Sequence, residues 1–248
     1  MDKINSAPLR DYALEEAARI RFIQAAVEGA GARGVVFANS GGKDCALAGI
    51  LCKKAVADTV SIAMPCGPAR SYGADLQDAR ELAARFGIES RAVDLGAACA
   101  ALLGGLGPGI SEAAARNVAP RLRMASLYAV AQSENRLVAG TSNRSEIFLG
   151  YFTKWGDGAS DFNPIADLTV TEVYEFLEHL GAPRSVMDKP PSAGLYPDQT
   201  DEGDLGFSYA ELDRYLLTGE AGRDMLELFS RLHGATAHKR RLPAAYGG

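Results

Sequence analysis

One strand–turn–helix stretch near the start of the chain constrains its fold more than any other segment. It begins with the apolar run Val35–Ala38, whose length and β-branched start are typical of a buried strand. A turn through Ser40, Gly41 and Gly42 follows, and residues 44–51 then have the composition of a helix. Glycines let backbone N–H groups approach a ligand closely, and the start of a helix adds unpaired N–H groups and a partial positive charge. The stretch therefore predicts an anion-binding turn.

The turn matches neither the Walker pattern G-x-x-x-x-G-K-[ST] nor the dinucleotide pattern G-x-G-x-x-G. An ordinary glycine-rich connection is the less favoured alternative for this turn, although such turns are common between strands and helices. Other segments of the chain have to decide between these interpretations.

Apolar runs alternate with helical patterns along the chain. The expected strands are 35–38, 59–64, 90–95 and 136–139, and the expected helices are 11–28, 44–51, 75–86, a long helix from 111 to about 131, 170–180, 208–217 and 223–232. We expect residues 104–109, which are rich in glycine, to form a flexible break. The alternation predicts an α/β fold with a doubly wound, mostly parallel sheet and helices on both faces. In such a fold, ligands bind at the carboxyl edge of the strands.

Two polar segments follow the fourth expected strand. Residues 140–146 form a polar cluster directly after it, and residues 150–164 form a long loop rich in glycine and aromatic residues. Long ordered loops of this kind tend to carry function, although a surface loop with buried aromatic side chains is the simpler alternative. Residues 188–204 look irregular, and we expect them to form a mobile loop that could cover a ligand.

The composition excludes several classes of function. A net charge of −5 argues against nucleic-acid binding, which usually needs a basic face. No apolar run approaches the length of a membrane span, and the polar start of the chain does not resemble a signal peptide. The four cysteines form no C-x-x-C pair, which fits a reducing cytoplasm better than a disulfide framework or a zinc site.

Five segments, in one order, resemble the ammonia-dependent NAD⁺ synthetases of the ATP pyrophosphatase (PP-loop) superfamily, whose fold is Rossmann-like. The similarity extends from about residue 33 to residue 243. The segments are S-G-G-x-D at 40–44, G-T-x-N-x-x-E at 140–146, G-x-x-T-K-x-G-D-G-x-x-D-x-x-P at 150–164, the helix at 209–216 and H-K-R-x-x-P at 238–243.

The resemblance implies that ATP adenylates the carboxylate of nicotinic acid adenine dinucleotide and releases pyrophosphate. Ammonia then displaces AMP and gives NAD⁺. Separating the α- and β-phosphates needs charge stabilisation by Mg²⁺ and backbone donors. The resemblance also implies a homodimer with the dinucleotide at its interface. Glutamine-using members carry an extra N-terminal amidase domain, so we expect a single domain over residues 1–248 that uses free ammonia.

The resemblance also implies roles for individual residues. Asp44 and Glu146 would bind Mg²⁺ and, together with Lys43, form the catalytic group. The expected ATP-binding residues are Asn39, Ser40, Gly41, Gly42, Lys43, Asp44, Cys45, Thr141 and Ser192. The expected substrate-binding residues are Arg121, Arg123, Lys154, Asp161, His238 and Lys239.

Three departures from the family pattern stand near these residues. Cys45 replaces the usual Ser, and a thiol is a weaker hydrogen-bond donor than a hydroxyl. Val170 stands where bacterial members usually carry a Lys that contacts phosphate, and Met64 precedes Pro65 where many members have an Arg. Cys45 also falls in the first turn of the expected helix, where the helix dipole can lower a thiol pKa, although free cysteines are more often small buried hydrophobes.

Two other functions remain open at this point. One is a related PP-loop ligase that adenylates a different carboxylate or acts on tRNA. The Thr153-Lys154 and His238-Lys239 pairs and the acidic net charge argue against it. The other is a nucleotide-binding homologue without catalysis, which would not need to retain the acidic pair of Asp44 and Glu146.

Overall fold

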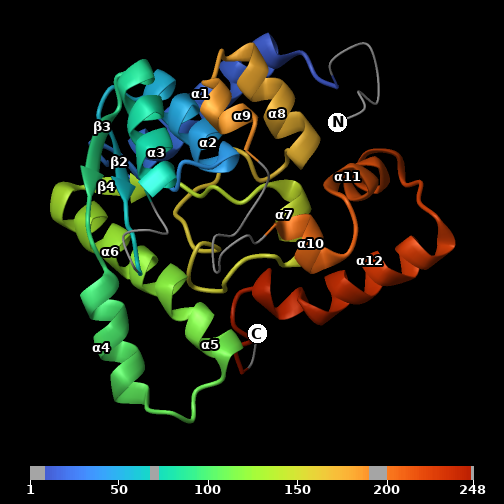
Figure 1. Cartoon of the computed structure of the whole chain (residues 1–248). Coiled ribbons are helices and arrows are strands. Elements are labelled where there is room, and N and C mark those ends of the chain that lie inside the picture. The colour runs from blue at the N-terminus through green and yellow to red at the C-terminus, as the bar shows by residue number, and fades with distance from the viewer. Residues whose placement is uncertain (1–8, 68–72, 190–199, 247–248) are drawn as a thin grey trace.

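The computed structural model describes residues 9–67, 73–189 and 200–246. In that part of the chain, strands form one sheet in the order β3-β2-β1-β4, and every pairing is parallel (Figure 1). The strands are β1 (Gly34–Ala38), β2 (Thr59–Ala63), β3 (Glu89–Ala92) and β4 (Arg136–Val138). The prediction of a parallel α/β sheet is confirmed. The chain enters the glycine-rich turn directly from β1, an inner strand.

The two faces of β1 point into two different apolar cores, as the alternation of side chains along a strand requires. Val35 and Phe37 pack in one core, and Val36 packs in the other. The first core is covered by helices α1 (Tyr12–Gly29), α2 (Lys43–Ala55), α3 (Gly73–Phe86) and α8 (Val170–His179). The second core is covered by α4 (Gly96–Leu106) and α6 (Val118–Glu134). Helices therefore cover both faces of the sheet, as expected.

A third apolar cluster holds the C-terminal helices together beside the sheet (Figure 1). Its largest buried side chains are Tyr209 and Phe229, and Phe207 packs edge-on against Phe229. The helices that contribute to it are α7 (Arg144–Leu149), α8, α10 (Asp201–Leu205), α11 (Tyr209–Thr218) and α12 (Arg223–Ala235). The short helix η2 (Ala237–Lys239) follows and contacts α12. Helices α5 (Glu112–Arg116) and α9 (Arg184–Met187) complete the described elements.

The structure corrects four expectations from the sequence. The long helix predicted from residue 111 is divided into α5 and α6 at Asn117. The side-chain amide of Asn117 donates to Ala113 O, and its side-chain oxygen accepts from the hydroxyl of Thr153. The predicted break at 104–109 begins later, because α4 continues to Leu106 with Leu103 packed on the core. Part of the segment predicted to be irregular, 188–204, lies outside the described residues, but its end belongs to α10, which Thr200 caps.

The third strand is also shorter than predicted, since it ends at Ala92. Across the described ranges, no helix combines the length and the hydropathy that a membrane span requires.

Close packing of α2 on β1 leads to a first prediction. A Cβ atom added at Gly49 would lie 2.3 Å from the ring of Phe37. We expect Gly49→Ala to destabilise the protein by about 1–3 kcal/mol, because the overpacked core has to shift, and to lower Tm by several degrees. The matched control is Gly104→Ala in α4, where nothing lies within 4 Å. Calorimetry that gave the two variants the same Tm would contradict this account.

Candidate active site

The turn after β1 is fixed by its own side chains and by α3. The Asn39 side chain accepts from Gly41 N and donates to Ala79 O in α3. Gly41 has φ +76°, and a Cβ atom there would lie 2.6 Å from Asp75 O. Only glycine meets both conditions without strain. The turn is therefore held in one conformation against the start of α2.

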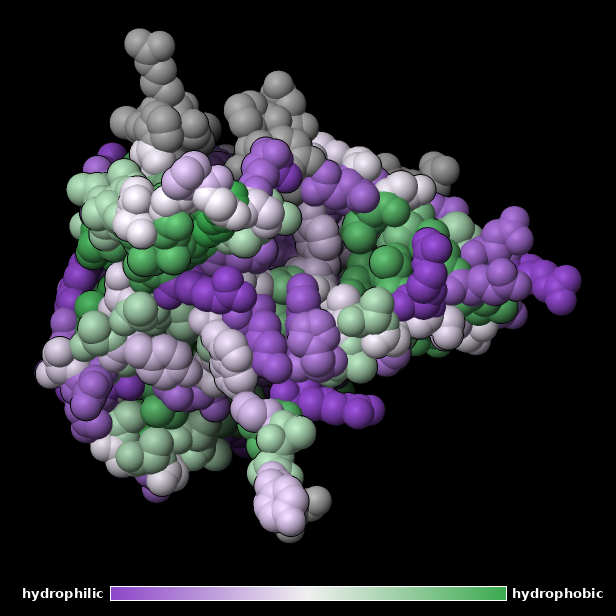
Figure 2. Space-filling model, turned by 90° about the horizontal axis from the view of Figure 1, so that it is seen from below, coloured by the Kyte–Doolittle hydropathy of each residue, from purple (hydrophilic) through white to green (hydrophobic). Residues whose placement is uncertain are grey.

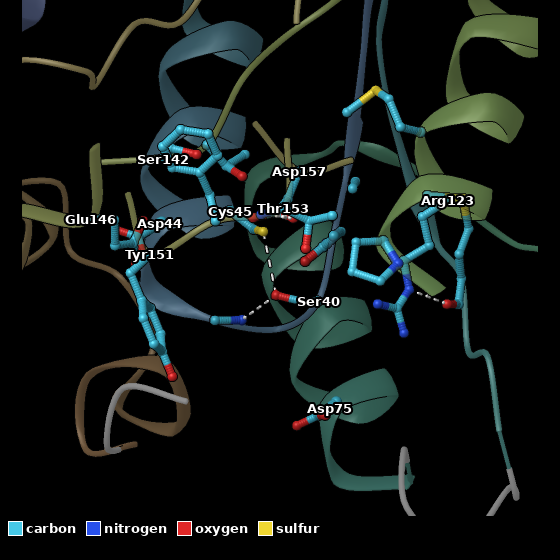
Figure 3. A pocket seen from close by; sticks show the side chains of 18 of the residues that line it. Ser40, Asp44, Cys45, Asp75, Arg123, Ser142, Glu146, Tyr151, Thr153 and Asp157 are labelled. Atoms are coloured by element: carbon cyan, nitrogen blue, oxygen red, sulfur yellow. Dashed lines mark hydrogen bonds between the residues drawn. The ribbon is translucent and has the colours of Figure 1, made fainter. Parts of the chain in front are cut away.

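A cavity of about 540 Å³ opens beside this turn (Figure 3). Segments that are far apart in the sequence line it: the turn and the start of α2, α6, the polar segment after β4, the 150–157 loop and the C-terminal region. The residues predicted from the sequence that line it are Asn39, Ser40, Gly42, Lys43, Asp44, Cys45, Arg123, Thr141, Glu146 and Lys239. The fold thus gathers most of the predicted ATP-binding residues at the carboxyl edge of the sheet.

Asp44 and Glu146 lie together in this cavity, each in the first turn of a helix (Figure 3). Asn143, which is fully buried, connects them. Its side-chain amide donates to Asp44 Oδ1 at 3.1 Å, its backbone N–H donates to Glu146 Oε2 at 3.2 Å, and its side-chain oxygen accepts from Glu146 N at 3.0 Å. The last two bonds form the capping box of α7. One residue therefore sets the position of both carboxylates.

Burial and the neighbouring Asp44 carboxylate raise the pKa of Glu146 well above its ordinary value. Two carboxylates that resist simultaneous ionisation attract a cation. In the described ranges, no group of three or more His, Cys, Asp or Glu side chains forms a metal cage. Mg²⁺ does not need one, because it usually binds through one or two carboxylates and completes its shell with water and substrate phosphates. The acidic pair fits that ion.

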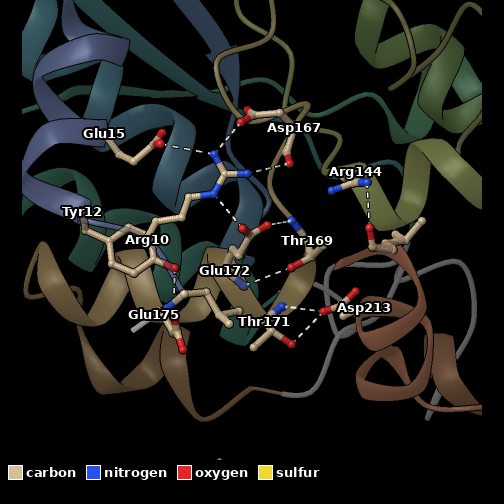
Figure 4. A network of polar contacts seen from close by, with 12 residues as sticks. Arg10, Tyr12, Glu15, Arg144, Asp167, Thr169, Thr171, Glu172, Glu175 and Asp213 are labelled. Atoms are coloured by element: carbon tan, nitrogen blue, oxygen red, sulfur yellow. Dashed lines mark hydrogen bonds and ion pairs between the residues drawn. The ribbon is translucent and has the colours of Figure 1, made fainter. Parts of the chain in front are cut away.

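A second network of buried polar groups connects α7 to α8 and α11 (Figure 4). Asp213 in α11 is fully buried and accepts from Ser145 Oγ at 2.5 Å and from both the N–H and the hydroxyl of Thr171 at 2.7 Å. Arg144 donates to Leu216 O. These contacts tie the helix that carries Glu146 to the C-terminal helices, so the acidic pair depends on their packing.

Four of the predicted substrate-binding residues lie away from this cavity. Arg121 donates to Lys154 O, and Lys154 Nζ donates to His238 O, so these three residues form a chain of contacts outside it. Asp161 accepts from Val138 N and from the hydroxyl of Tyr128. Their predicted roles are untested by these contacts. Gly41 supports the turn without lining the cavity, and Ser192 lies outside the described residues.

The cavity also contains acidic groups that were not predicted from the sequence. Asp157 accepts from Thr153 N, and burial raises the pKa of its carboxyl. Buried carboxyls with a raised pKa are frequent among acid–base groups. Asp157 lies within the G-D-G part of the 150–164 motif, which could have drawn attention to it. Asp201 and Asp204 also line the cavity and come from α10, which the sequence reasoning treated as irregular.

The structure explains two of the departures from the family pattern. Cys45 Sγ lies 3.3 Å from Ser40 Oγ, and burial raises the pKa of the thiol, so it stays neutral in spite of its place in the first helical turn. Val170 is fully buried in the third apolar cluster, where a lysine head group would have no place. Any cation for phosphate therefore has to come from elsewhere in the cavity.

A parallel sheet with a glycine-rich turn after an inner strand, and an acidic pair facing that turn, is the architecture of a PP-loop α/β protein. Comparison with known proteins identifies the family. Residues 16–243 match the model of the NAD synthase family. A relative, the NH₃-dependent NAD⁺ synthetase of Carboxydothermus hydrogenoformans, is 43% identical to this chain, and the alignment covers 86% of this chain and 89% of the relative. The chain belongs to the NAD synthase family.

Two solved structures show how similar the fold is. The NMN synthetase from Francisella tularensis superposes with a TM-score of 0.90 at 33% identity and covers 96% of this chain and 100% of its own. The NH₃-dependent NAD synthetase from Campylobacter jejuni, solved with a nitrate ion, superposes with a TM-score of 0.82 at 28% identity and covers 95% and 99%.

The surroundings of Cys45 generate a second prediction. Because the thiol is neutral and backbone N–H groups of the turn can hold phosphate, we expect Cys45→Ser to bind ATP within about threefold of the wild type. Isothermal titration with a non-hydrolysable ATP analogue and Mg²⁺ measures this. A loss of tenfold or more would show that the sulfur itself has a function.

Proposed function

We propose that this protein is an ammonia-dependent NAD⁺ synthetase that acts in the cytoplasm and that one domain over residues 1–248 carries the activity. The observation that carries the proposal is the acidic pair, Asp44 and Glu146, facing the S-G-G-K-D turn within one cavity. The names of its relatives support the same reaction. Four buried, unpaired cysteines fit a reducing compartment.

In this proposal, the turn and the start of α2 hold the phosphates of ATP. The backbone N–H groups at the start of α2 and the partial charge of the helix end face the cavity and suit the β- and γ-phosphates that leave as pyrophosphate. Mg²⁺ bound by Asp44 and Glu146 would neutralise charge that develops on the phosphate oxygens. Arg123 donates through Nε to Met64 O, which fixes its guanidinium at the wall of the same cavity.

Lys239 contributes another positive charge to the lining of the cavity. Its Nζ donates to Gly150 O and Phe152 O, both at 2.8 Å, and burial lowers its pKa. These contacts hold the 150–157 loop against the C-terminal region. We propose that Lys239 binds the acceptor in this position and that the neighbouring Asp157 carboxyl serves the amidation step as an acid–base group.

The acceptor is tested by one incubation series. The purified protein receives ATP, Mg²⁺ and ammonium with either nicotinic acid adenine dinucleotide or nicotinic acid mononucleotide, and chromatography follows the amide, AMP and pyrophosphate. We expect NAD⁺ and AMP in equal amounts from the dinucleotide, and none when glutamine replaces ammonium. The mononucleotide is the second candidate, because the NMN synthetase superposes with a TM-score of 0.90, against 0.82 for the Campylobacter enzyme. Exclusive formation of NMN would favour it.

The acidic pair generates a third prediction. Asp44→Ala and Glu146→Ala should each lower kcat by at least a thousandfold, because each removes one of two protein ligands of the metal. The matched control is Glu28→Ala on the outer side of α1, which should leave kcat unchanged. Near-normal turnover in either site variant would remove its residue from the metal site.

We further propose that the protein forms a homodimer through the surface of α4 and α6. Residues 95–110 contain no charged side chain, and Leu102, Leu106 and Tyr128 are 43%, 54% and 36% exposed. Figure 2 shows hydrophobic side chains gathered on the left of the lower face, the side on which α4 lies in Figure 1. An apolar surface of this kind is typical of an interface between subunits.

The dimer proposal leads to a fourth prediction. Leu102→Glu combined with Leu106→Glu should convert the dimer to a monomer, because it places two charges within the apolar surface. Sedimentation velocity measures the mass. The control is Leu14→Glu on α1, which is 68% exposed and lies outside this surface. A wild-type protein that sediments as a monomer at micromolar concentration would contradict the proposal.

A further inference from the structure

Lys43 directs its side chain into the protein, although lysine is mostly a surface residue. It is only 6% exposed. Its Nζ donates to Asp44 Oδ2 at 2.7 Å and lies 3.8 Å from Glu146 Oε1, and the ring centroid of Tyr209 lies 5.9 Å away. A buried ammonium needs such partners, so the acidic pair accounts for its position.

The four carboxylate oxygens of the acidic pair are divided between two partners. Asn143 takes Asp44 Oδ1 and Glu146 Oε2. The remaining oxygens, Asp44 Oδ2 and Glu146 Oε1, face Lys43 Nζ. A divalent cation bound by both carboxylates fits best at these same two oxygens, because Glu146 Oε2 belongs to the capping box of α7 and Asp44 Oδ1 accepts from the Asn143 amide. The ammonium and the metal therefore compete for one position.

We propose that Lys43 is an internal counter-cation of the acidic pair and that a divalent metal ion has to displace its ammonium in order to bind. The proposal rests on the proposed function in taking Asp44 and Glu146 as metal ligands. In the absence of metal, the ammonium offsets the repulsion between the two carboxylates and keeps the site assembled. A free divalent ion then binds weakly, because it has to break an existing ion pair.

The proposal differs from a purely structural ion pair in one respect. A structural pair would stabilise the fold equally at every metal concentration. A counter-cation that competes with metal couples the stability of the fold to the metal concentration. Removing the counter-cation therefore lowers the stability of the metal-free protein and raises its affinity for metal.

The experiment compares the wild type with Lys43→Met after removal of metal with EDTA and in the absence of nucleotide. Mn²⁺ serves as the probe, with binding followed by electron paramagnetic resonance and Tm by calorimetry. For Lys43→Met, we expect a Tm on the order of 10 °C below the wild type without metal, because a buried carboxylate pair loses its partner. We also expect Mn²⁺ to bind roughly tenfold more tightly and to restore most of the lost Tm.

The matched control is Lys53→Met. Lys53 belongs to the same helix, and its Nζ donates to Ala57 O at the surface. This variant loses the same charge and should show wild-type Tm and Mn²⁺ affinity. Equal Mn²⁺ affinity in the wild type and in Lys43→Met would overturn the proposal, as would a loss of Tm that Mn²⁺ does not restore.

A second variant decides the result if Lys43→Met does not fold without metal. Lys43→Met combined with Glu146→Gln removes the ammonium together with one carboxylate charge, so it should fold in metal-free buffer and bind Mn²⁺ weakly. Failure of the double variant to fold would overturn the proposal. Because no substrate is used, a protein that makes no NAD⁺ but gives the expected titrations would contradict the proposed function and leave this inference intact.

Discussion

The site depends on the bonds of a single buried amide, the side chain of Asn143. Two carboxylates at the same edge of a sheet repel each other, and their separation is fixed only if something holds both. Asn143 caps α7 and at the same time donates to Asp44, which belongs to the helix after β1. Since β1 and β4 are neighbours in the sheet, one side chain can reach both helix starts. The parallel order of the strands thus has a direct chemical consequence.

Helix starts also explain why the acidic pair and the glycine-rich turn can share one cavity. A helix N-terminus favours negative charge, whether it comes from a carboxylate or from a phosphate. The Asp44 carboxylate is stabilised in this way because it belongs to the first turn of α2. The start of α2, with its unpaired backbone N–H groups, lines the same cavity. The C-terminal helices contribute differently, because Asp213 fixes α7 through Ser145 and so holds Glu146 in place from the outside.

Much of this arrangement could be predicted from the sequence. The apolar runs at 35–38 and 59–64 and the S-G-G-K-D turn predicted the parallel sheet and its carboxyl-edge site, because strand period and turn chemistry are local properties. The division of the helix at Asn117 could not be predicted, since it depends on Thr153, a residue far along the chain. For the same reason, the positions of Arg121, Lys154 and His238 relative to the cavity follow from tertiary contacts that no local pattern contains.

The contacts of Arg10 have a consequence for the order in which parts of the chain can fold. Its guanidinium bonds Glu172, which is 2% exposed and whose other oxygen accepts from Thr169 N at the start of α8. The two partners are 162 positions apart, so this closure has a high contact order and comes late in folding. During synthesis Arg10 has to wait for Glu172 until most of the chain has been made, whereas α1 can pack on α2 as soon as α2 has been made. The nascent protein therefore buries one face of α1 early and fixes the segment that precedes this helix only when α8 is present.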